Sequence, residues 1–149
     1  MNKQLFRVLI AEDIPGESLL IEEVLRGSDI IFSPSCVSNQ QDFKSELQEF
    51  IPDIIISCDT NPRLSGIWVV SETRKWSATV PVVVVSDLYE QAHVVKYFEA
   101  GAADFISYDQ LVFLPLIVKR LLEINEAHVP ANSERVKIAA RLALVKEEE

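Results

Sequence analysis

The chain has 149 residues, of which 48% are hydrophobic, and this combination is typical of one globular domain with a substantial core. The formal charge of -9 at pH 7 repels a phosphate backbone, so nucleic-acid binding by this segment is not expected. Two cysteines are too few for a disulfide framework, and no secretion signal or run of about 20 apolar residues is recognised. A cytoplasmic protein without membrane attachment is therefore expected.

Short apolar runs rich in β-branched residues predict strands that are covered on both faces. These runs are residues 8–11, 54–56, 82–85 and 105–106. A fifth candidate strand, residues 30–37, contains Pro34, which cannot donate to a hydrogen-bond ladder and therefore belongs at a sheet edge.

Between the strands, apolar residues recur at helical spacing. The four predicted stripes are Leu19, Leu20, Val24 and Leu25; Phe43, Leu47 and Phe50; Ile67, Val70 and Trp76; and Val94, Val95 and Phe98. Gly101 is placed to end the fourth helix, and a fifth helix should begin near Pro115 and run toward Glu126. Residues 128–149 are expected to form a linker and a further helix, beyond a domain of residues 1–127 that leads to an output domain outside this chain.

Alternation of strands and helices predicts a doubly wound α/β fold, with a five-stranded parallel sheet between two helical layers. Such folds bind ligands at the carboxyl ends of their strands. The first strand is followed there by Glu12 and Asp13. These carboxylates suit a hard divalent cation, but they also suit the first turn of a helix, and the pair alone does not decide between the two.

Residues 52–66, 81–86 and 101–107 add to this acidic pair. Together the segments resemble, in order and spacing over residues 7–122, the receiver domain of response regulators in two-component signalling. The resemblance implies strand order 2-1-3-4-5 and phosphoryl transfer from a histidine kinase to an aspartate that also helps to bind Mg²⁺. It assigns Glu12 and Asp13 to the metal, Ser86 to the phosphoryl oxygens, and Phe105 to an aromatic residue that reorients on activation.

The chain departs from the family pattern at the phosphoryl site. The acceptor position falls on Cys58 and the family lysine position on Tyr108, while Asp87 and Asp109 stand where a small residue and a proline are usual. Asp59 could serve as the acceptor only through a one-residue slip or a bulge at the strand end, because side chains alternate along a regular strand.

These departures weaken the expected phosphoryl chemistry. A thiol is a poor ligand for Mg²⁺, which prefers oxygen, so Mg²⁺ binding is expected to be weak. Cys58 is expected to be a buried, unreactive thiol, and one intervening strand puts it about 9 to 10 Å from the chain that carries Cys36, too far for a disulfide. Tyr108 is expected to cap the site, and His93 to face solvent.

The sequence therefore predicts a non-enzymatic signalling module with a degenerate phosphoacceptor site. It acts by protein contact, as a monomer or homodimer, on a histidine kinase or another signalling protein. The expected contact surface is the fourth helix, fifth strand and fifth helix, with Tyr89, Tyr97 and Phe105, whereas Val95 is assigned to core packing. One alternative is an active receiver phosphorylated on Asp59. Another is a flavodoxin-like cofactor-binding enzyme, which the four glycines and the acidic first loop disfavour.

Overall fold

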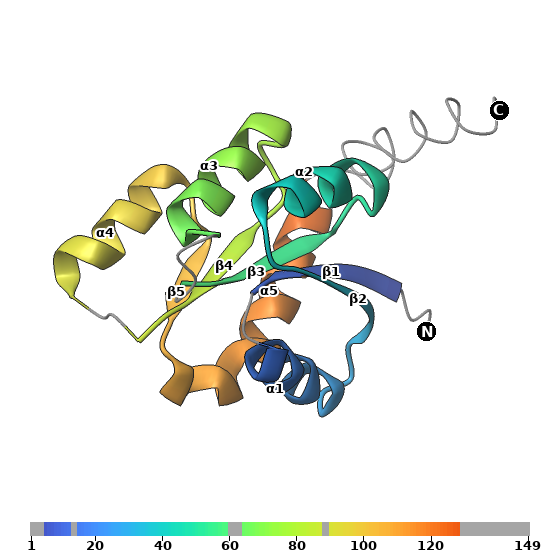
Figure 1. Ribbon diagram of the computed structural model, residues 1–149. Coiled ribbons are helices and arrows are strands. Elements are labelled where there is room, and N and C mark those ends of the chain that lie inside the picture. The colour runs from blue at the N-terminus through green and yellow to red at the C-terminus, as the bar shows by residue number, and fades with distance from the viewer. Residues whose placement is uncertain (1–4, 13–14, 60–63, 88–89, 129–149) are drawn as a thin grey trace, which may run out of the picture.

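The computed structural model describes residues 5–12, 15–59, 64–87 and 90–128. Its five strands form one parallel sheet in the order β2-β1-β3-β4-β5, as predicted (Figure 1). The strands are β1 (Leu5–Ala11), β2 (Ile31–Val37), β3 (Ile54–Cys58), β4 (Val82–Val85) and β5 (Asp104–Ile106). The strand with Pro34 lies at the edge of the sheet, where a missing backbone N–H is tolerated.

Helices cover both faces of the sheet, which confirms the doubly wound α/β class. They are α1 (Pro15–Arg26), α2 (Gln40–Glu49), α3 (Gly66–Trp76), α4 (Gln91–Ala100) and α5 (Leu114–His128), with a short 3₁₀ helix, η1 (Tyr108–Phe113), before α5. Figure 1 shows α1 and α5 on one face and α2, α3 and α4 on the other. The sequence did not predict η1. The tail helix predicted after residue 133 lies outside the described residues.

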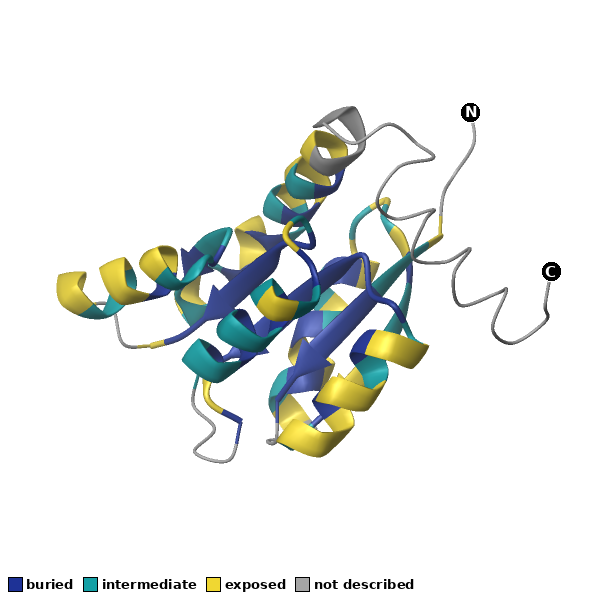
Figure 2. Ribbon diagram, turned by 90° about the horizontal axis from the view of Figure 1, so that it is seen from above, coloured by how far each residue is buried: buried dark blue, intermediate teal, exposed yellow. Residues whose placement is uncertain are grey.

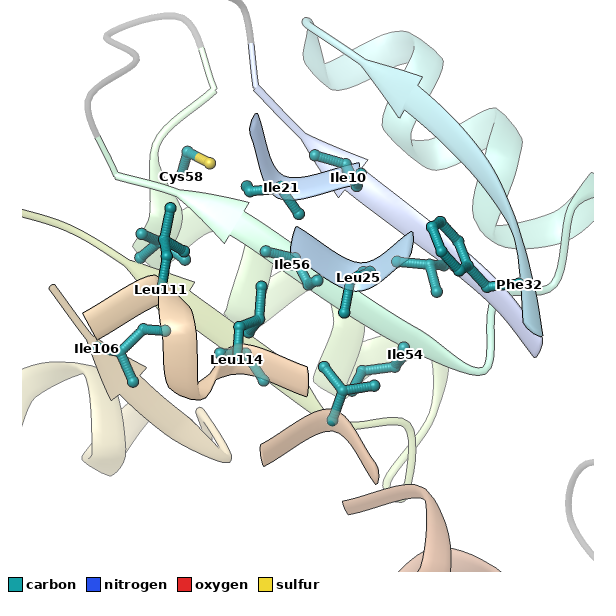
Figure 3. Packing of buried hydrophobic residues seen from close by; sticks show 14 of the residues in the cluster. Ile10, Ile21, Leu25, Phe32, Ile54, Ile56, Cys58, Ile106, Leu111 and Leu114 are labelled. Atoms are coloured by element: carbon teal, nitrogen blue, oxygen red, sulfur yellow. The ribbon is translucent and has the colours of Figure 1, made fainter. Parts of the chain in front are cut away.

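Side-chain alternation along the strands divides the core between the two faces. On β3, Ile54, Ile56 and Cys58 pack with α1 and α5, whereas Ile55 packs with α2, α3 and α4. Figure 3 shows the first cluster, with Cys58 at its end beyond Ile56. The central strands are buried and the outward helix faces are exposed (Figure 2).

Two helix ends follow from local chemistry. Ser65 caps the start of α3, where its hydroxyl accepts a hydrogen bond from the backbone N–H of Trp68 at 3.2 Å. Gly101 ends α4 with φ 114, a left-handed conformation that glycine adopts without a Cβ clash. A Cβ at Gly101 would also lie 2.9 Å from the side chain of Arg74. The glycine that ends the helix therefore also makes room for Arg74.

Two predicted helix faces are partly wrong. On α1 the buried apolar residues are Leu25, as predicted, and Ile21, which the predicted stripe left out, whereas Leu19 and Leu20 are 59% and 44% exposed. On α4 the buried residue is Tyr97, and Val95 is exposed instead of packed in the core. Among the described residues, no helix is long and apolar enough to cross a membrane.

Candidate functional site

The carboxyl edge of the sheet brings together residues from three strand ends. Glu12 follows β1, Cys58 ends β3, and Ser86 follows β4. These three residues are only 4%, 0% and 0% exposed. Backbone hydrogen bonds hold these ends in register, from the Glu12 N–H to Val37 at 2.9 Å and from the Ser86 N–H to Ile106 at 2.9 Å. Asp13, the second predicted metal residue, lies outside the described residues.

Cys58 lies in an acidic cluster at the end of β3, with Glu12 after β1 and Glu17 on α1. Its sulfur and carboxylate oxygens of Glu12 and Glu17 lie within 4.8 Å of one another. Burial raises the pKa of the Cys58 thiol, and the negative charge of Glu12 raises it further. The thiol is therefore protonated at neutral pH and is a weak nucleophile.

Tyr108, at the start of η1, is partly buried against the core cluster that contains Cys58. Its hydroxyl donates a 2.6 Å hydrogen bond to Oε1 of Glu17, which ties η1 to the first turn of α1. Burial is the largest cause that raises the pKa of the Tyr108 phenol, followed by its neighbours Cys58 and Glu17. Sequence reasoning missed Glu17, although its place in the turn after the acidic pair was an available signal.

The described groups that act on Cys58 and Tyr108 are acidic or neutral. In the described part of the chain, the pKa of Cys58 is shifted by Glu12, Glu17 and Tyr108, and the pKa of Tyr108 by Cys58 and Glu17. None of these groups is a cation. A phosphoryl group needs positive charge or hydrogen-bond donors around its oxygens. Tyr108 offers one neutral donor, and Glu17 already accepts from it.

The described donor set also fits Mg²⁺ poorly. Mg²⁺ requires close to octahedral coordination by oxygen ligands. Two of the three clustered donors are carboxylates, but the third is the sulfur of Cys58, and Glu17 is engaged by Tyr108.

Asp59 lies beside Cys58 in the sequence but faces a different element. Its Oδ2 lies 2.8 Å from Nε2 of His93 on α4, and its carboxylate also hydrogen-bonds the Tyr97 side chain. His93 is therefore not solvent-facing as predicted, since its side chain is only 26% exposed and paired with Asp59. The backbone N–H of Asp59 still extends the sheet, donating to Val85 at 2.8 Å.

The predicted switch and contact residues are mostly internal. Tyr97 on α4 and Phe105 on β5 are buried in the same core cluster, at 1% and 4% exposure, so neither side chain forms part of the outer surface. Tyr89 lies outside the described residues. Asp87 is exposed and does not cap α4, whose N-cap residue is Glu90.

Comparison with known protein families identifies the class of this domain. A family model described as the response regulator receiver domain matches residues 8–109, and the chain belongs to this family. It is thus a receiver domain of two-component signalling, a class of domain that interacts with histidine kinases and other signalling proteins.

Individual relatives are distant in sequence and close in fold. The chemotaxis protein CheY of Thermotoga maritima is 27% identical over 100 residues, which cover 67% of this chain and 82% of CheY. A CheY-like response regulator receiver domain protein from Methanospirillum hungatei superimposes with a TM-score of 0.72 at 15% identity, covering 84% of this chain and 99% of that structure. The receiver domain of a histidine kinase from Syntrophus aciditrophicus has a TM-score of 0.69 at 29% identity, covering 79% and 90%.

Proposed function

We propose that this receiver domain is a non-enzymatic signalling module that works by protein contact and without ordinary aspartyl phosphorylation. One observation carries the proposal: a buried, protonated thiol, Cys58, lies beside the acidic side chains of Glu12 and Glu17 at the end of β3, and Tyr108 is hydrogen-bonded to Glu17. An ordinary receiver has its acceptor carboxylate and its lysine at the positions of Cys58 and Tyr108.

The chemical consequence is a loss of several contributions at once. Phosphoryl transfer depends on a positioned nucleophile and on neutralisation of the charge that spreads over the equatorial oxygens. At this edge the nucleophile is replaced by a thiol with a raised pKa, and the lysine cation by a neutral phenol. Mg²⁺ binding at Glu12 and its neighbours is proposed to be weak, because the third donor is sulfur.

The proposed partners are a histidine kinase or another signalling protein, or a second copy of the chain. The α4–β5–α5 side is the proposed contact surface. It exposes Val95 and Phe98 on α4, at 45% and 46%, and Val112, Phe113 and Leu116 on η1 and α5, at 74%, 55% and 64%. Large exposed apolar side chains on these elements are the support for a contact surface there.

Two alternatives have less support. Phosphorylation of Asp59 would require its carboxylate to leave His93 and Tyr97 and to turn toward the pocket of Cys58. A flavodoxin-like enzyme would need a loop that cradles phosphate at the first strand end, where this chain has the buried carboxylate of Glu12.

Mass spectrometry after incubation with a small phosphodonor and Mg²⁺ tests the proposal. The expected result is no phosphoryl adduct on the native chain under conditions that saturate an ordinary receiver. The matched variant is Cys58→Asp with Tyr108→Lys, which restores both missing groups and should recover much more labelling than either single substitution. A stoichiometric adduct on Asp59 of the native chain would overturn the proposal.

A further inference from the structure

Asp59 connects the end of β3 to two successive turns of α4. Nε2 of His93 donates to Oδ2 of Asp59 at 2.8 Å, and the hydroxyl of Tyr97 makes a second hydrogen bond to the same carboxylate. His93 and Tyr97 are four residues apart, so both lie on the helix face that packs toward the sheet. One carboxylate therefore holds α4 at two points.

Ring packing extends this link to β5. The His93 ring lies 5.1 Å from the Tyr97 ring and 5.9 Å from the Phe105 ring, and the rings of Tyr97 and Phe105 are 5.4 Å apart. All three separations are within the range of favourable aromatic contacts. Movement of α4 away from Asp59 would therefore disturb Phe105 as well.

Gly66 provides the space that this arrangement needs. A Cβ at Gly66, the first residue of α3, would collide with the hydroxyl of Tyr97. The same hydroxyl contacts the backbone of Ile67, so Tyr97 crosses the start of α3 on its way to Asp59. Burial and the hydrogen bond to Asp59 raise the pKa of the Tyr97 phenol, which is therefore a neutral donor at physiological pH.

We propose that Asp59 is the positioning residue for α4, holding the α4–β5 side in one arrangement through His93 and Tyr97. The inference rests on the proposed function in one respect, that this side of the domain is the contact surface. The contact is built into the chain, next to the degenerate acceptor position, and needs no phosphoryl group. Partner binding then depends on a carboxylate whose direct contacts are with α4.

If the hydrogen bonds to Asp59 hold α4, they should slow the hydrogen exchange of its backbone amides. Partly buried hydrogen bonds to a charged group are stronger than neutral ones. Their loss should let α4 open locally more often than the rest of the domain, which amide hydrogen exchange detects. The expected change is an increase of about tenfold in the exchange rates of α4 amides, with those of α2 unchanged.

The variants separate the hydrogen bonds from the ring packing. Asp59→Ala removes the acceptor, whereas His93→Phe and Tyr97→Phe keep a ring and each remove one donor. All three should speed exchange in α4, and Asp59→Ala combined with His93→Phe should do little more than Asp59→Ala alone, because the pair shares one bond. Glu99→Gln is the control, since Glu99 is exposed on α4 and its substitution should leave exchange unchanged.

Two results would overturn the inference: α4 exchange that does not respond to Asp59→Ala, or effects of Asp59→Ala and His93→Phe that simply add. If Asp59→Ala does not fold, the ring-retaining Tyr97→Phe and His93→Phe variants decide, and native exchange rates in both would refute the inference. The measurement uses no phosphodonor. A phosphoryl adduct found by mass spectrometry would therefore refute the proposed function without changing the exchange result.

Discussion

Replacement of Tyr108 by phenylalanine removes the hydrogen bond that ties η1 to α1 and keeps the ring against the core. The lost contact is the 2.6 Å bond from the Tyr108 hydroxyl to Glu17. Hydrogen bonds to charged groups contribute about 1.5–3 kcal/mol, and partial exposure of both residues places this one near the lower end. We expect the free energy of unfolding to fall by about 1–2 kcal/mol.

Urea unfolding followed by circular dichroism measures this change, and a double-mutant cycle isolates the pair. Tyr108→Phe, Glu17→Ala and the double variant should give a coupling energy of about 1 kcal/mol. If the loss of stability in the double variant equals the sum of the two single losses within about 0.3–0.5 kcal/mol, the two side chains do not interact in solution. The same bond holds η1 beside Cys58, so Tyr108→Phe should also speed modification of Cys58 by a thiol reagent.

Three further predictions follow from burial and packing. In the native chain a thiol reagent should label exposed Cys36 much faster than buried Cys58, and equal rates would contradict the burial of Cys58. Folding raises the pKa values of Cys58, Tyr97 and Tyr108. As the pH rises, these groups therefore lose their protons in the unfolded chain before they do so in the folded chain, the thiol above about pH 8.5 and the phenols above about pH 10. The free energy of unfolding measured in urea should therefore be constant below this pH range and fall as the pH rises through it. A free energy that stays constant up to about pH 10.5 would show that folding does not raise these pKa values. Gly66→Ala should lower the free energy of unfolding by about 1–3 kcal/mol and speed exchange in α4, because the new methyl group displaces Tyr97.

Local sequence patterns determined most of the architecture. The β-branched runs at residues 54–56 and 82–85 predicted two central strands, and Pro34 identified the edge strand. Gly101 predicted the end of α4. These features are readable because strand burial, proline and left-handed glycine each constrain the backbone within a few residues. The strand order came from the family resemblance and not from any single pattern.

Contacts between distant segments were decided only by the tertiary structure. Periodicity indicated that Asp59 and Cys58 point to different sides, but nothing local identified His93, 34 residues away, as the partner of Asp59. Tyr108 and Glu17 are 91 residues apart and meet only because η1 packs beside α1. On α1, helical spacing correctly placed Leu25 in the core, but it also took Leu19 and Leu20 as internal. The position of the sheet decided that Ile21 is buried instead of these two residues. A sequence pattern states which residues share a face of one element, whereas the packing of elements against one another decides what that face meets.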